Sequence, residues 1–116
     1  QVTMKISACP DARKVALSAM QVHRDLDHEH IVRLEDVYVS SCAIHMVMEH
    51  LEGGNLSTAL AKRGRFSEDD AKVVLRQLLQ AVDYLHQRSI VHRDIKLESI
   101  MFADSGSSKV KLIDFC

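Results

Sequence analysis

A dense polar segment at residues 90–101 most constrains what this chain can fold into. Its sequence is Ile-Val-His-Arg-Asp-Ile-Lys-Leu-Glu-Ser-Ile-Met. The β-branched residues Ile90, Val91 and Ile95 lie among six polar ones: His92, Arg93, Asp94, Lys96, Glu98 and Ser99. A solvated loop does not need β-branched residues placed this regularly, and a buried strand does not carry so many charges. The segment therefore predicts a loop held between two short strands, with its polar side chains presented to one side.

Asp94 and Lys96 lie two residues apart within this segment. In extended backbone, side chains two residues apart point to the same side. A carboxylate that can accept a hydroxyl proton would then lie beside an ammonium that can hold a phosphate oxygen, which suits phosphoryl transfer. The alternative is an ordinary exposed ion pair of little energetic value.

The composition bounds the class of protein. The chain has 116 residues, of which 47% are hydrophobic and 27% charged, as in a small globular domain. Its formal net charge of −1 argues against nucleic-acid binding. Cys9, Cys42 and Cys116 are far apart, which indicates free thiols in a reducing intracellular compartment, most simply the cytoplasm. No run of about 18 apolar residues is present, so we expect no membrane span.

Both ends of the sequence fall inside patterned segments. Residue 1 is Gln, and Met4 lies within a segment that resembles a strand. At the other end, residues 112–116 stop in the middle of an apolar pattern. We therefore expect a fragment, or a gene product that has lost its flanks.

The first part of the chain predicts a small sheet with one helix. Residues 1–7 indicate a strand, and Pro10 begins a helix over 11–26. Residues 31–39 and 43–49 predict an antiparallel hairpin. The apolar face of the helix has four members at helical spacing: Val15, Ala19, Val22 and Leu26.

Beyond residue 50 the pattern becomes helical. Residues 51–55 indicate a linker, and 56–63 a short helix that ends at Gly64. Ser67 and Asp70 resemble a capping box at the start of a helix that runs to about residue 88. Residues 100–103 and 109–113 predict a second hairpin. The apolar stripe of the long helix is predicted core: Val74, Leu75, Leu78, Leu79, Val82 and Leu85.

Three segments in this order resemble the eukaryotic protein kinase family. Residues 92–99 (HRDIKLES) are similar to its catalytic loop, HRDLKPEN, and residues 112–115 (LIDF) to the approach to its metal-binding Asp-Phe-Gly turn. Residues 2–6 (VTMKI) resemble its Val-Ala-Ile-Lys strand. The resemblance covers nearly the whole chain, and its motifs are specific in combination.

The resemblance implies an α+β, partial bilobal kinase fold. Residues 1–50 would be a small lobe that begins at its third strand, residues 51–55 the hinge linker, and residues 56–116 the first part of the large lobe. The implied activity is transfer of a phosphoryl group from ATP and Mg²⁺ to a protein Ser or Thr. The style of residues 64–68 and 111–115 resembles the calcium/calmodulin-regulated branch, but no regulatory partner is identified.

Site roles follow from the same resemblance. Asp94 would orient the substrate hydroxyl and accept its proton, while Lys96 would neutralise the moving phosphoryl group and points to Ser/Thr specificity. Asp114 and Ser99 would bind Mg²⁺. His92 and Phe115 would pack to align the site.

The nucleotide pocket would be built from both lobes. Met48 would guard its back, and the Glu49 carbonyl and Leu51 amide would hydrogen-bond the adenine edge. The remaining contacts would come from four residues: Lys5 on the α- and β-phosphates, Thr3 and Met101 on the two faces of the adenine ring, and Asn55 at the ribose hydroxyls.

Several positions depart from the family pattern. No GxGxxG segment is present, and Ala19 stands where the family has the Glu that pairs with the strand lysine. His23 falls on a normally apolar position, Ser99 replaces Asn, and Cys116 replaces Gly. These departures keep two alternatives open. One is a catalytically impaired kinase-like module that binds nucleotide or acts as a scaffold, and the other is a non-functional fragment with an exposed apolar patch.

Individual residues also have simpler readings. Lys5 could be a solvated lysine on an edge strand. His28 and His30 fit a polar turn better than a transition-metal site, since no partner ligands have zinc-type spacing. Met48 and Met101 could be core rather than pocket lining.

Overall fold

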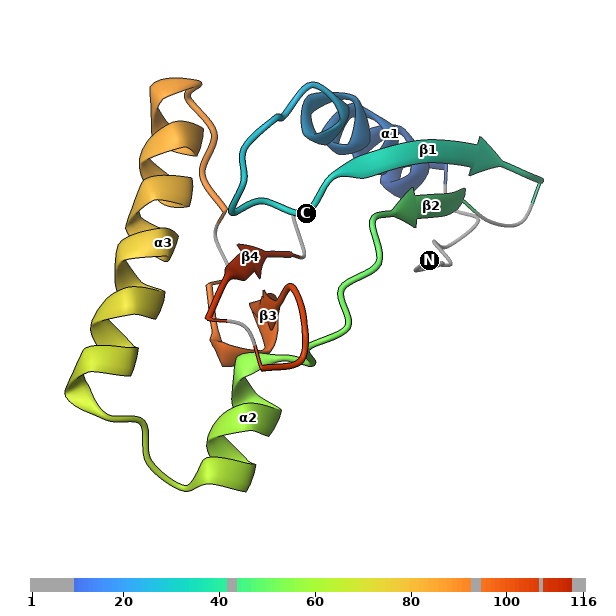
Figure 1. Ribbon diagram of the computed structural model, residues 1–116. Helices are drawn as coiled ribbons and strands as arrows, with labels where there is room; N and C mark the ends of the chain where they lie inside the picture. The colour runs from blue at the N-terminus through green and yellow to red at the C-terminus, as the bar shows by residue number, and fades with distance from the viewer. Residues whose placement is uncertain (1–9, 42–43, 93–94, 107, 114–116) are drawn as a thin grey trace. The chain divides into compact units, whose positions relative to one another are not determined.

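The computed structural model describes residues 10–41, 44–92, 95–106 and 108–113 (Figure 1). The chain divides into two compact units. The first comprises residues 1–27, 32–50 and 115–116, and the second comprises residues 28–31 and 51–114. Residues 28–31 thus group with the second unit, and the predicted lobe boundary at residues 51–55 stays a prediction.

The first unit contains a helix and a hairpin. Helix α1 spans Pro10–Arg24, and strands β1 (Leu34–Val39) and β2 (Ile44–Met48) pair antiparallel, as predicted. Buried and half-buried side chains alternate along β2, which agrees with the apolar alternation in its sequence. The strand predicted over residues 1–7 lies outside the described residues.

The buried face of α1 differs from the predicted one. Val15 and Val22 are 71% and 46% exposed, whereas Met20 and His23 are each only 4% exposed. His23 can be buried on this face because its Nε2 lies 2.9 Å from the carbonyl oxygen of Val32, and this hydrogen bond satisfies that ring nitrogen. Of the predicted face, Leu26 is buried, beyond the end of the helix.

The buried imidazole of His23 makes stability depend on pH. Burial lowers the pKa of His23 below its ordinary value of 6.5, and the bond to Val32 opposes this only in part. The unfolded chain then binds a proton at His23 more readily than the folded chain. The contribution of neutral His23 to the free energy of unfolding is therefore present above about pH 6.5 and is lost as the pH drops toward the folded pKa. We expect the free energy of unfolding to decline between pH 7.5 and pH 5.

Denaturant titrations at a series of pH values measure this slope. His23→Gln keeps a donor for the Val32 carbonyl and removes the titration, so its slope should be shallower than that of the unsubstituted chain. His86→Gln makes the same substitution at an exposed histidine and is the matched control. Equal slopes for His23→Gln and the unsubstituted chain would contradict the assignment.

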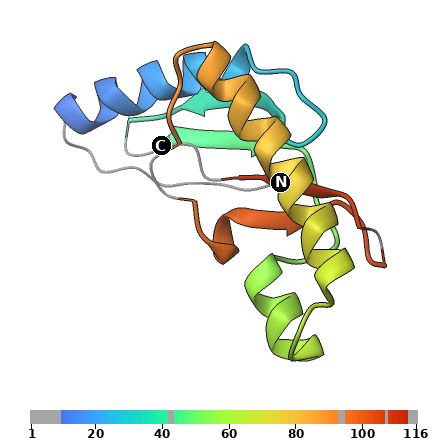
Figure 2. The ribbon, with the colours of Figure 1, turned by 90° about the vertical axis from the view of Figure 1, so that its left-hand side faces the viewer.

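The second unit packs two helices with a short hairpin (Figure 2). Helices α2 (Leu56–Arg63) and α3 (Glu68–Gln87) occur where the sequence predicts them. The 3₁₀ turn η1 (Leu97–Ser99) leads into β3 (Ile100–Phe102), which pairs antiparallel with β4 (Val110–Leu112). Within this unit, α3 packs against the hairpin and contacts β4.

Side-chain caps and a glycine set the helix ends. The Ser67 hydroxyl accepts a hydrogen bond from the Asp70 amide at 3.1 Å, which confirms the N-terminal cap predicted for α3. Gly64 ends α2 at a φ of 77° and donates its N–H to the Leu60 carbonyl. A side chain would be strained at that φ, so the helix ends where the sequence supplies a glycine.

Only part of the predicted apolar stripe of α3 is core. Val74, Ala81 and Leu85 are buried, whereas Leu75 and Leu79 are 55% and 59% exposed. The stripe is wider than the surface that the second unit offers, and these two leucines lie toward its edge. No helix among the described residues is both long and apolar enough to cross a bilayer.

The loop at residues 90–101 is flanked differently from the prediction. Ile90 and Val91 form no strand; instead α3 ends nearby, and the Ile90 amide bonds back to the Leu85 carbonyl at 2.9 Å. Ser89 adopts a φ of 60° to make this reversal. On the other side, β3 supplies the expected strand and follows the 3₁₀ turn η1.

Candidate functional site

The end of the 90–101 segment lies beside the residue that precedes Asp114. The Ile113 amide donates to the Ser99 carbonyl at 2.8 Å, which extends the pairing of β3 with β4 by one step. Because the two strands run antiparallel, the end of the 92–99 motif meets the start of the 112–115 motif. Two segments that the sequence separates are therefore joined by main-chain hydrogen bonds.

His92 makes a second connection to the same residue. Its imidazole is buried, and its Nε2 lies 2.8 Å from the Ile113 carbonyl oxygen. A carbonyl only accepts, so this nitrogen carries the hydrogen. His92 thus has the packed position that the resemblance implies, whereas Phe115 lies outside the described residues.

Lys96 and Ser99 lie in contrasting environments. Lys96 is exposed, with an extended backbone at φ −149° and ψ 172°, and its carbonyl accepts the Ser99 amide at 3.0 Å. Ser99 is fully buried. Asp94 lies outside the described residues, so its pairing with Lys96 stays a prediction.

The linker before α2 runs alongside β3. Gly53 donates its amide to the Phe102 carbonyl at 3.1 Å, and the Phe102 amide donates to the Gly54 carbonyl at 2.9 Å. Asn55 and Met101 form an isolated antiparallel bridge at the end of this pairing. The second unit therefore brings together Asn55 and Met101, two of the residues predicted to contact the nucleotide, with Leu51 directly before the paired linker.

Asn55 also has a structural role that was not predicted from the sequence. Its side-chain oxygen accepts the Thr58 amide at 2.7 Å and caps α2. An Asn directly before a helix is a common N-cap, and that signal was present in the sequence. The ribose role predicted for Asn55 would then fall to its amide nitrogen, which is a donor.

Met48 and Glu49 belong to the first unit. Met48 is buried. Glu49 is anchored twice by Arg33, since its amide donates to the Arg33 carbonyl and its Oε1 accepts the Arg33 amide, both at 3.0 Å. This pairing orients the backbone at Glu49, whose carbonyl the resemblance assigns to adenine.

The predicted magnesium ligands are described only in part. Asp114 lies outside the described residues, as do Thr3 and Lys5 of the nucleotide set. Ser99 offers a hydroxyl, a weaker ligand for Mg²⁺ than a carboxylate. The part of the chain that the structure describes contains no group of three or more His, Cys, Asp or Glu side chains able to hold a metal. The donor chemistry of the predicted site therefore depends on Asp114.

Known proteins are similar to this chain in sequence and in fold. The family model for the protein kinase domain matches residues 2–116. Serine/threonine-protein kinase SRK2F of Arabidopsis thaliana is 42% identical over 93 residues, which cover 80% of this chain and 27% of the relative. Serine/threonine-protein kinase 33 of Mus musculus is 36% identical over 118 aligned positions, covering 96% of this chain and 24% of the relative.

A solved kinase structure is also similar to this chain in fold. The crystal structure of Rad53 in complex with AMP-PNP matches with a TM-score of 0.82 and 35% identity, over 86% of this chain and 27% of that one. The chain thus spans about a quarter of the length of the relatives it matches. Its fold is α+β, a part of the kinase fold, as predicted from the sequence. The chain belongs to the protein kinase family and is similar to its serine/threonine members.

Proposed function

We propose that this chain forms part of the ATP site of a protein serine/threonine kinase. One observation carries the proposal: Ile113 is bonded through its amide to Ser99 and through its carbonyl to His92. Both ends of the catalytic-loop motif are thereby tied to the residue before Asp114. In this family, phosphoryl transfer requires those two motifs to act on one nucleotide.

The residues would divide the chemistry as follows. The Asp94 carboxylate accepts the proton of a Ser or Thr hydroxyl, whose oxygen bonds to the γ-phosphorus of ATP while the bond to the β–γ bridging oxygen breaks and ADP leaves. The Lys96 ammonium lowers the cost of charge on the moving group, and Lys5 holds the α- and β-phosphates. Mg²⁺, held by Asp114 with Ser99, would neutralise phosphate charge.

The cysteines bear on the cellular compartment in which this kinase would act. Three widely spaced cysteines fit a reducing intracellular compartment, most simply the cytoplasm, where ATP and protein substrates are available. Regulation in the style of the calcium/calmodulin-dependent branch stays a prediction.

Nucleotide-dependent stabilisation tests the proposal. A ligand at 100 times its Kd stabilises the folded state by about 2.7 kcal/mol, so ATP with Mg²⁺ should raise the Tm of the chain. Lys5→Ala and Asp114→Ala should each abolish that rise. Lys14→Ala and Asp104→Ala, at exposed residues of the same types, are the matched controls and should retain it. The absence of any rise in the unsubstituted chain would contradict the proposal.

A second candidate is a kinase-like module that binds nucleotide without catalysis. It is favoured by Ser99, whose hydroxyl replaces the family's Asn and is fully buried. Transfer of ³²P from ATP to a Ser/Thr peptide distinguishes the two. Transfer that Asp94→Asn removes supports the enzyme, whereas a Tm rise without transfer supports the binding module.

A further inference from the structure

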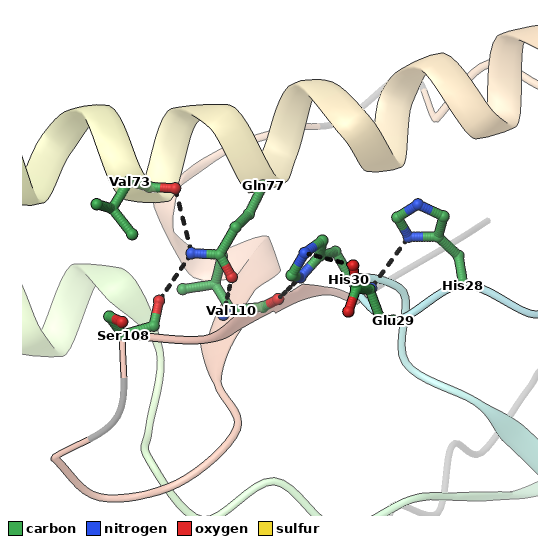
Figure 3. Close-up of polar contacts among 7 residues, drawn as sticks. All are labelled: His28, Glu29, His30, Val73, Gln77, Ser108 and Val110. Atoms are coloured by element: carbon green, nitrogen blue, oxygen red, sulfur yellow. Dashed lines mark hydrogen bonds and ion pairs between the residues drawn. The ribbon is translucent and has the colours of Figure 1, made fainter.

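Side chains from two distant segments occupy the outer edge of strand β4 (Figure 3). On its inner edge, β4 pairs with β3. On its outer edge, the Val110 amide donates to Oε1 of Gln77 at 3.0 Å, and the Val110 carbonyl lies 3.0 Å from Nδ1 of His30. The Leu112 amide donates to the His30 carbonyl at 2.8 Å. The edge away from β3 is therefore hydrogen-bonded at two successive outward-facing residues.

The Gln77 amide takes the place of a neighbouring strand. While its oxygen accepts from Val110, its nitrogen donates to the Ser108 carbonyl at 2.8 Å and to the Val73 carbonyl at 3.2 Å (Figure 3). The Gln77 side chain thus bonds to an acceptor at residue 108 and to a donor at residue 110. A slip of one residue would present these groups to the other edge of the strand and leave the amide with mismatched partners.

His30 is itself held in place by its neighbours. Its amide donates to Nδ1 of His28 at 3.0 Å, and its Nε2 lies 3.5 Å from Oε1 of Glu29. The His28 ring also packs against Tyr84 of α3, with centroids 4.9 Å apart. Residues 28–31 therefore form a braced turn from which His30 reaches β4.

We propose that Gln77 and His30 are positioning residues that fix the register of β4 and the main-chain position of Ile113, the residue directly before Asp114 in the sequence. The inference rests on the proposed function, in which Asp114 binds Mg²⁺. Strand β4 has three residues, and a two-stranded hairpin of that length is marginal without further support. A slip by one residue would move the strand end by about 3.4 Å, whereas ligand distances in metal sites tolerate about 0.2 Å.

Gln77→Glu tests this role with a change of one group. The carboxylate can still accept from Val110 but sets an oxygen against the Ser108 carbonyl in place of the donor. Gln80→Glu makes the same change at an exposed position one turn along α3 and is the matched control. We would measure amide hydrogen exchange at Val110 and Ile113, and affinity for ATP by calorimetry with Mg²⁺ and with EDTA.

The expected result has two parts. Gln77→Glu should accelerate exchange at Val110 and Ile113 by roughly tenfold, the equivalent of one lost hydrogen bond. It should weaken binding of ATP with Mg²⁺ by about tenfold or more, as loss of a ligand-orienting partner does, and leave binding in EDTA unchanged. Gln80→Glu should change none of these values.

Three outcomes would overturn the inference. Unchanged exchange in Gln77→Glu would show that the amide does not hold the strand. Faster exchange with unchanged affinity for ATP and Mg²⁺ would show that the strand does not position the metal ligand. If the unsubstituted chain binds no ATP with Mg²⁺, the proposed function itself fails, and the positioning role fails with it.

Discussion

Replacing Leu85 by Ala is expected to lower the free energy of unfolding by about 2–5 kcal/mol, the usual cost of emptying a buried leucine site. Leu85 is 1% exposed, and its carbonyl accepts the Ile90 amide where the chain reverses after α3. Val74 and Ala81 are buried on the same helix, so the lost side chain would leave a cavity against a packed surface. A small domain has about 5–15 kcal/mol in total, so this single change removes a large share.

Leu79→Ala provides the matched control on the same helix. Leu79 is 59% exposed, so its truncation should change stability by no more than about 0.5 kcal/mol. Urea titrations of the three chains, followed by far-UV circular dichroism, measure both differences. Similar losses at the two positions would mean that α3 buries a different face from the one described.

Gly53→Ala is expected to cost about 1–3 kcal/mol and to loosen the linker from β3. A Cβ at this position would overlap that of Phe102 and would lie 2.8 Å from the Phe102 carbonyl oxygen and 2.7 Å from that of Asp104. Two of these three neighbours are main-chain atoms, which cannot rotate away. The linker would have to move, although its own hydrogen bonds to Phe102 hold it there.

Gly54→Ala separates this steric effect from backbone strain. Gly54 has open space around a new Cβ but a φ of 73°, so Ala should cost about 1–2 kcal/mol while the linker stays in place. Exchange of the amides at position 53 and at Phe102 distinguishes the two variants. Both amides should exchange faster in Gly53→Ala, and protection in that variant equal to that in Gly54→Ala would refute the steric argument.

The sequence was sufficient for features that depend on near neighbours. Helix α3 and its cap at Ser67 follow from a periodic stripe and a local hydrogen bond, and the alternation in β2 follows from pairing with one adjacent strand. The prediction of the buried face of α1 was wrong because a count of apolar residues favours Val15 and Val22 and gives no weight to a histidine. Only the tertiary structure supplies the Val32 carbonyl that makes burial of His23 acceptable.

In the candidate site, too, residues of a local motif could be predicted from the sequence, whereas residues in long-range contacts could not. Lys96 and Ser99 could be nominated because they belong to one contiguous motif, and their roles stay predictions. Gln77 and His30 were not, because their bonds to Val110 span 33 and 80 residues of sequence. Neither residue type nor spacing announces such a contact, and only a folded β4 reveals it.

The bonds around β4 also set the order in which the second unit can be completed during synthesis. His30 leaves the ribosome 80 residues before the strand whose carbonyl it contacts, and α3 follows well ahead of that strand. Until residues 110–112 emerge, the Gln77 oxygen and Nδ1 of His30 cannot bond to Val110, and only the local contacts of these two side chains, with Val73 and Glu29, can form. Helices α2 and α3 can therefore form early, but the docked second unit has to wait for the late strand, which makes its folding a long-range and comparatively slow event.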